Sequence, residues 1–105
     1  MIQLQDIRSC VKEGRYRITE HADEETYNDG LSHNDVTYTL FAGEIIEQYP
    51  KDKPYPSCLV FGKNKNAEPI HSVWAYNGDA AAAVLITVYR PDAEKWIDWK
   101  IRRKP

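Results

Sequence analysis

The sequence predicts an α+β domain in which N-terminal helices pack on a four-stranded antiparallel sheet. Apolar residues recur at helical spacing before Gly43, whereas the chain after it has the patterning of β-strands. The dipeptide Asn77-Gly78, between two such strands, is a strong hairpin signal because both residues accept positive φ. Helices followed by neighbouring strands are typical of a layered α+β fold. A length of 105 residues suits one domain, so residues 1–105 are assigned to a single domain.

Start and stop signals place three helices in the first part of the chain. A Thr or Ser precedes two of them and can cap the first free backbone amides, and a glycine follows each of the three. The predicted elements are a helix over residues 3–13, an extended segment over 16–18, a helix from Thr19 to about Asn28 and a helix from Ser32 that stops at Gly43.

Four strands are predicted after the helices. They cover residues 44–49, 58–61, 70–76 and 81–89. The last strand is apolar on both alternating sets, which predicts a central position with both faces covered. A short helical turn is expected from Pro91 through Trp96.

Charge and cysteine content narrow the classes of function. The net charge is −2, which argues against indiscriminate binding to nucleic acid. Acidic residues crowd positions 20–29, whereas the end of the chain from Lys95 is basic. The basic end is a solvated tail or a local patch for phosphate or acidic groups. Cys10 and Cys58 show no CxxC spacing and are read as buried free thiols.

Targeting and ligand motifs are absent from the sequence. No apolar run approaches the ~20 residues of a membrane-spanning helix, and no secretory signal precedes the domain. A cytoplasmic protein that does not contact a membrane is therefore expected. The histidines and cysteines match no short metal-ligand spacing, so neither a metal nor a cofactor is expected.

His21 is the leading candidate for chemistry. It lies in the first turn of the second predicted helix, and Glu25 follows one turn later on the same face. An imidazole oriented by a carboxylate is the arrangement used for general acid–base catalysis near neutral pH. The structural alternative is a surface pair with Glu25 or a histidine bonded to backbone.

His71 and Tyr89 are predicted to lie on the same face of the sheet. Counting outward from a two-residue turn at Asn77-Gly78 places His71 opposite Val84, with Tyr89 beyond the start of the preceding strand. His71 has small apolar neighbours, which suits a core histidine. Tyr89 can donate to a phosphate and Arg90 can bind its charge, although a half-buried strand tyrosine needs no such role.

Several of these residues belong to an ordered series along the chain. The segments are Ile18-Thr19-Glu20-His21-Ala22, Gly30-Leu31-Ser32, Asp35-Val36, Gly43-Glu44-Ile45-Ile46-Glu47, Tyr49-Pro50, Pro69-Ile70-His71 and Ile86-Thr87-Val88-Tyr89-Arg90-Pro91. The series resembles the bacterial family called domain of unknown function 4258, from about Tyr16 to Trp96. The family often has Ser where Thr19 stands, and both residues can cap a helix.

The resemblance implies a fold similar to that of RelE-type toxins and other small ribonuclease-like proteins. It therefore implies an RNA-cleaving or RNA-binding toxin that acts by metal-independent acid–base chemistry. Toxins of that kind are usually basic, whereas this chain is mildly acidic. The alternative is a non-catalytic module that binds a protein or a small ligand. The expected partner is RNA or a cognate protein.

For RNA cleavage, a 2′-hydroxyl would attack the neighbouring phosphate. His21 or His71 would act as base or acid, and Tyr89 and Arg90 would stabilise the charge of the phosphorane. The residues assigned to catalysis are His21, His71, Tyr89 and Arg90, and those assigned to substrate binding are Arg17 and Glu25.

Overall fold

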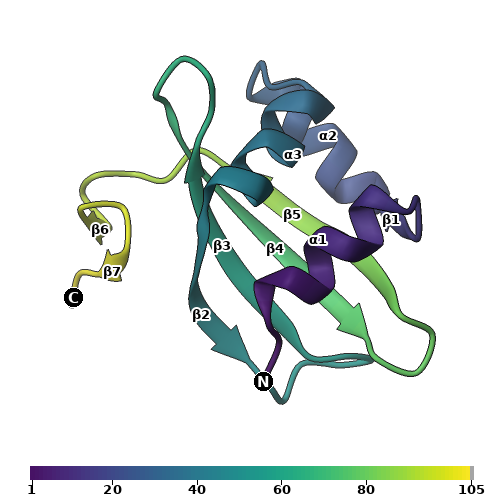
Figure 1. The fold of residues 1–105 in the computed structure, drawn as a ribbon. Helices are drawn as coiled ribbons and strands as arrows, with labels where there is room; N and C mark the ends of the chain where they lie inside the picture. Colours follow the sequence, from purple (N-terminus) through teal and green to yellow (C-terminus); the bar gives the residue numbers. More distant parts are fainter. Residues whose placement is uncertain (105) are drawn as a thin grey trace.

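The computed structural model describes residues 1–104 as three helices, a five-stranded sheet and a small C-terminal hairpin (Figure 1). The helices are α1 (Leu4–Lys12), α2 (Glu20–Asn28) and α3 (His33–Ala42). The sheet strands are β1 (Tyr16–Ile18), β2 (Glu44–Tyr49), β3 (Ser57–Lys63), β4 (Pro69–Asn77) and β5 (Ala82–Tyr89). The hairpin strands are β6 (Trp96–Ile97) and β7 (Ile101–Arg102). The predicted α+β class and the order of its elements are confirmed.

The helix boundaries follow the capping signals in the sequence. The Thr19 hydroxyl accepts a hydrogen bond from the Ala22 amide and so begins α2. Ser32 and Asp35 form a reciprocal capping box at the start of α3. Such side chains satisfy backbone amides that have no partner inside the helix. The predicted second and third helices are therefore confirmed at their first residues.

The sheet differs from the four-stranded antiparallel prediction. Its strand order is β1-β5-β4-β3-β2, and β1 pairs in parallel with β5. The Ala83 amide donates to the Arg15 carbonyl, and the Thr19 amide donates to the Leu85 carbonyl. The short segment 16–18 thus covers part of an edge that would otherwise expose unpaired backbone groups. Three residues are too few for a periodic signal, so the sequence indicated an extended segment and not its partner.

The hairpin between β4 and β5 is longer than the predicted two-residue turn. Asn77 pairs with Ala82, and Ala81 in the connecting loop has a φ of 49°. A bulge follows between Val73 and Trp74, where the register shifts by one residue. These two changes place His71 opposite Tyr89 and not opposite Val84. The two side chains share a face, as predicted, and they are also direct neighbours.

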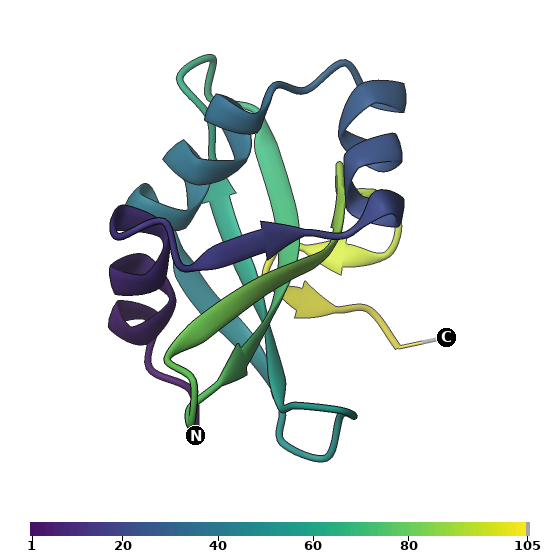
Figure 2. The same cartoon turned by 90° about the vertical axis from the view of Figure 1, so that its right-hand side faces the viewer.

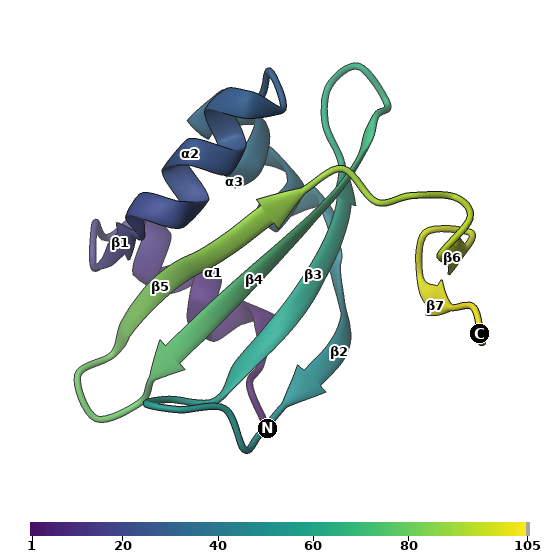
Figure 3. The ribbon, with the colours of Figure 1, turned by 180° about the vertical axis from the view of Figure 1, so that it is seen from behind.

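The two faces of the sheet are covered by different elements. Figure 2 shows α1 and α3 on one side of the sheet and the C-terminal hairpin on the other. The main core lies under α1 and α3 and contains the fully buried Trp74 and Leu85. Helix α2 packs mainly on β5, at the edge of the sheet (Figure 3). We call the side opposite α1 and α3 the second face of the sheet.

The end of the chain adds a hairpin to the predicted helical turn. The amides of Lys95 and Trp96 donate to the Asp92 carbonyl, so the expected turn is present. The chain then reverses through Asp98 and Trp99, which both have positive φ, and β7 pairs with β6. Such a conformation is uncommon for an aspartate and rarer for a tryptophan, so the sequence carried no turn signal here.

Helix α3 and strand β3 approach each other through two glycines. A Cβ atom on Gly43 would meet the backbone oxygens of Phe61 and Thr39, and one on Gly62 would also meet the Thr39 oxygen. These positions have no positive φ, so the requirement for glycine comes from space alone. The close approach fixes the height of α3 above the sheet.

We predict that Gly62→Ala lowers the free energy of unfolding by about 1–3 kcal/mol, because overpacking forces backbone shifts. Gly78→Ala is the matched control, since its Cβ would make only an ordinary 3.7 Å contact with the Tyr76 ring. Urea denaturation of both variants measures the difference. Equal stability of the two variants would contradict the close contact between α3 and β3.

Candidate functional site

The best-defined polar constellation joins α2 to the free end of β5. One oxygen of Glu25, Oε1, accepts hydrogen bonds from the Thr87 hydroxyl and from the Val88 amide at 3.1 Å. The same oxygen lies 3.2 Å from Nε2 of His21. The Glu25 side chain is 26% exposed, whereas that of His21 is 67% exposed. A half-buried carboxylate therefore positions an accessible imidazole.

The local fold explains this arrangement. β1 pairs with β5 only as far as Leu85, so the Val88 amide lies on an edge without a strand partner. Glu25 satisfies that amide from the neighbouring helix, as a buried backbone donor requires. The cap at Thr19 sets the start of α2, and the four-residue spacing then brings His21 onto Glu25. The predicted pair of His21 and Glu25 is present.

The geometry of this pair suits proton transfer. The donors from Thr87 and Val88 fix the carboxylate, and the carboxylate in turn restricts the orientation of the imidazole. Most of the His21 surface stays accessible to a substrate. A positioned histidine backed by a carboxylate is a general base or acid in many enzymes. Thr87 was not singled out by the sequence, because an alternating strand offers many such hydroxyls.

His71 lies in a different environment, under the C-terminal hairpin. Its side chain is fully buried, and its ring packs edge-on against Trp96 at 4.5 Å between centroids. Nε2 lies 2.6 Å from the Trp99 carbonyl oxygen, and Nδ1 lies 3.0 Å from the Tyr89 hydroxyl. Burial lowers the pKa of His71, although the hydrogen bond to Trp99 opposes the shift. Both ring nitrogens have partners, so His71 is a core histidine in this state.

The remaining predicted residues do not converge with His21 on one centre. Arg90 Nη1 pairs with Glu68 at 3.1 Å, and its Nε donates to the Asp29 carbonyl. Arg17 is exposed on β1 and lies opposite Val84 in the sheet register. Of the six predicted site residues, His21 joins Glu25 and His71 joins Tyr89, whereas Arg17 and Arg90 are separate. The sequence could not foresee this because the partners come from different elements.

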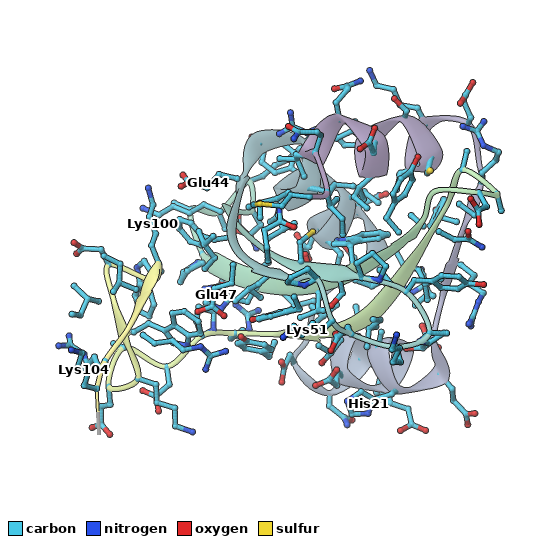
Figure 4. All side chains as sticks on the ribbon, turned by 90° about the horizontal axis from the view of Figure 1, so that it is seen from below. His21, Glu44, Glu47, Lys51, Lys100 and Lys104 are labelled. Carbon is cyan, nitrogen blue, oxygen red and sulfur yellow. The ribbon has the colours of Figure 1, made fainter. Side chains whose placement is uncertain are left out.

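A second polar cluster borders the hairpin. Arg102 Nε lies 2.9 Å and 3.2 Å from the two carboxylate oxygens of Glu47, and the Tyr49 hydroxyl donates to the same carboxylate. Burial, together with the bond to Glu47, raises the pKa of Tyr49 to about 12. Figure 4 shows Lys100 near Glu44, to which it is paired at 3.0 Å, with Glu47 close by. Lys100 and Arg102 of the basic tail are therefore paired with acids of β2.

Other chemical groups of the chain are inert or scattered. Cys10 and Cys58 are buried free thiols, as predicted, and burial raises the pKa of Cys58 to about 12. Within residues 1–104, no group of three or more His, Cys, Asp or Glu side chains could hold a metal ion. Among the same residues, no helix is long and apolar enough to cross a membrane.

The buried state of His71 makes a pH dependence measurable. Because its pKa is lowered on folding, the unfolded chain binds the proton more tightly. We therefore predict that the free energy of unfolding falls as the pH is lowered below about 6.5, with a slope of at most about 1.4 kcal/mol per pH unit. His71→Gln, which has no such proton, should flatten this slope.

The exposed His33 provides the control for that measurement. His33→Gln should retain the acid-dependent loss of stability, because the buried imidazole is still present. Urea unfolding from about pH 7 to about pH 5 gives the slopes for the three proteins. A slope that is the same with and without His71 would show that its proton affinity does not change on folding.

Comparison with known proteins gives one match. The model of the family described as domain of unknown function (DUF4258) matches residues 18–90, which is more than half of the chain. No curated protein and no solved structure matches the chain. The matched region includes α2, α3 and β2 to β5, with His21, Glu25, His71 and Tyr89, but ends before the C-terminal hairpin. The chain belongs to the family of domain of unknown function 4258.

Proposed function

We propose that this protein is a metal-independent, RNA-cleaving domain of the RelE-toxin kind, with His21 and Glu25 as its acid–base pair. The observation that carries the proposal is the shared oxygen of Glu25. That atom is anchored by Thr87 and Val88 and also contacts His21. The contacts of Glu25 with Thr87 and Val88 stabilise the edge of the sheet. The exposed imidazole of His21, in contrast, contributes nothing to the packing of the core. Helices before an antiparallel run of strands are also part of the arrangement implied by the ribonuclease-like resemblance, although the sheet here has a fifth, parallel strand.

The proposed reaction uses the ribose of the substrate as the nucleophile. His21 removes the proton of the 2′-hydroxyl, and the 2′-oxygen forms a bond to the adjacent phosphorus. The bond from phosphorus to the 5′-oxygen then breaks, that oxygen takes a proton from water, and the imidazolium of His21 returns its proton to solvent. Glu25 stabilises the imidazolium that forms on His21. The products are a 2′,3′-cyclic phosphate and a 5′-hydroxyl end, and no metal ion is consumed or required.

A non-catalytic module that binds a cognate protein is the second candidate function. The pairing of cations within the chain favours it, because Arg90 is paired with Glu68 and Arg102 with Glu47. The net charge of −2 also gives RNA little long-range attraction. The two candidate functions differ in whether the protein cleaves RNA with the help of His21.

Cleavage of a total RNA pool in the presence of a chelator distinguishes the candidates. We predict that the wild-type protein cleaves RNA and that His21→Ala lowers the rate by about 10²–10⁴-fold, the usual contribution of a positioned acid–base group. The matched control is His33→Ala. His33 lies 2.8 Å from Asp23 and is 56% exposed, but the Asp23 partner is itself 64% exposed.

The His33→Ala protein should cleave at the wild-type rate. Both variants should melt close to the wild type, because neither side chain is buried. Absence of cleavage by the wild type, or equal cleavage by wild type and His21→Ala, would overturn the proposed catalysis and leave the interaction module. A large loss of melting temperature in His21→Ala would assign that residue to stability.

Two substitutions separate the proposed catalytic role of Glu25 from its structural role. Glu25→Gln keeps an oxygen that accepts from Thr87 and Val88, so stability should stay near the wild-type value. Glu25→Ala leaves both donors without their acceptor and should cost about 1–3 kcal/mol. We predict that both variants lose RNA cleavage, because neither has the charge that stabilises protonated His21. Wild-type cleavage by Glu25→Gln would restrict Glu25 to the structural role.

A further inference from the structure

The C-terminal hairpin covers the second pair of predicted site residues. Trp96 is almost completely buried against the His71 ring, and the Trp99 carbonyl is hydrogen-bonded to Nε2 of His71. The hairpin begins after residue 90, where the family match ends. Figure 1 shows it as a separate unit connected to the sheet by one extended stretch of chain. A segment outside the family domain therefore closes over residues inside it.

The attachment of this hairpin does not involve the strand ladder of the sheet. β6 and β7 pair only with each other and form their own two-stranded sheet. Two ion pairs hold the hairpin to β2, namely Arg102 with Glu47 and Lys100 with Glu44. The Lys100 side chain is 45% exposed and that of Arg102 is 61% exposed, and ion pairs of exposed side chains are weak and screened by salt. Detachment of the hairpin would expose Trp96 and the His71 ring, whereas the backbone ladder of the five-stranded sheet would stay intact.

The hairpin also fixes the protons of His71 and Tyr89. A backbone carbonyl only accepts hydrogen bonds, so the 2.6 Å contact with Trp99 requires a proton on Nε2 of His71. In the neutral ring Nδ1 is then bare and accepts the hydroxyl proton of Tyr89 across 3.0 Å. The Tyr89 proton therefore points to His71 and is not available to a substrate.

We infer that the C-terminal hairpin is an autoinhibitory strap, which RNA displaces by competing with Glu44 and Glu47 for Lys100 and Arg102. When the strap leaves, His71 loses the carbonyl that holds its proton on Nε2. The other tautomer donates from Nδ1 to Tyr89 and releases the hydroxyl proton of Tyr89 toward the second face. This inference deepens the proposed function and rests on it.

The released Tyr89 hydroxyl would lie on the strand that anchors the acid–base pair. Thr87, which anchors Glu25, and Tyr89 alternate to the same face of β5, so their Cα atoms are about 7 Å apart along the strand. A phosphate bound over this face would lie between the acid–base pair and the tyrosine. Tyr89 would then donate to a phosphate oxygen on which negative charge develops.

The test uses the full chain with Lys100→Ala and Arg102→Ala combined. The control combines Arg103→Ala and Lys104→Ala, which remove the same charge from the tail. Arg103 bonds to Ala93 of the same segment, so the control leaves both ion pairs to β2 in place. Two readouts are independent of RNA: the ¹⁵N shifts that report the His71 tautomer, and the modification rate of His71 by diethyl pyrocarbonate. RNA cleavage is the third readout.

If the hairpin is such a strap, we expect Nε2 of His71 to be protonated in the wild type and in the control. In the variant with both Lys100→Ala and Arg102→Ala we expect the ¹⁵N shifts of Nδ1 and Nε2 of His71 to move toward each other. The rate of His71 modification and the rate of RNA cleavage should each rise about fivefold, because two ion pairs that hold the hairpin are lost. Unchanged His71 readouts in this variant would overturn the strap. Cleavage that stays at the wild-type rate while His71 becomes reactive would overturn its inhibitory role.

One further outcome separates this inference from the proposed function. If His71 becomes reactive and its tautomer changes, but neither protein cleaves RNA, the detachable strap is supported and the ribonuclease proposal is overturned. The exposed His33 serves as the internal standard for the modification reagent in every sample.

Discussion

The contact between the Glu25 carboxylate and the free end of β5 is the interaction on which the candidate site depends. β1 is too short to pair with the whole of β5, so the Val88 amide needs another acceptor. Glu25 provides it from α2 and binds the Thr87 hydroxyl at the same time. One charge-assisted anchor thereby fixes the helix beside the sheet edge and positions His21. Stability and the placement of a reactive group come from the same atom.

The two histidines of the family domain that were assigned to catalysis have opposite environments and therefore different chemistry. His21 has one anchored partner and a mostly exposed ring, so it is open to solvent. His71 is buried, with its pKa lowered by burial and each ring nitrogen bonded. Its Nε2 proton is donated to the Trp99 carbonyl, and its Nδ1 accepts the proton of the Tyr89 hydroxyl. The hairpin outside the family domain thus decides how His71 and Tyr89 present their protons.

The uneven charge of the chain is also explained by the fold. From the sequence, the basic tail was either a solvated end or an anion-binding patch; in the fold, Lys100 and Arg102 of this tail pair with Glu44 and Glu47 of β2. Arg90, which follows β5, pairs in the same way with Glu68, which precedes β4. Acidic and basic groups far apart in sequence thus lie next to each other at the surface. Phosphate groups could compete for these cations only locally.

The sequence by itself determined the local features of this protein. The capping residues Thr19 and Ser32, the β2 strand and the pair of His21 with Glu25 depend on neighbours within one or two turns of chain. Family membership followed from a spaced series of such local signals.

Only the tertiary structure decided the contacts between distant segments. These are the parallel pairing of β1, the longer loop and bulge that place His71 opposite Tyr89, the Glu25 contact with Thr87, and the hairpin over His71. The physical reason is that local propensity fixes the conformation of a few residues. Which edge, carbonyl or carboxylate meets an unpaired polar group depends on how the whole chain packs.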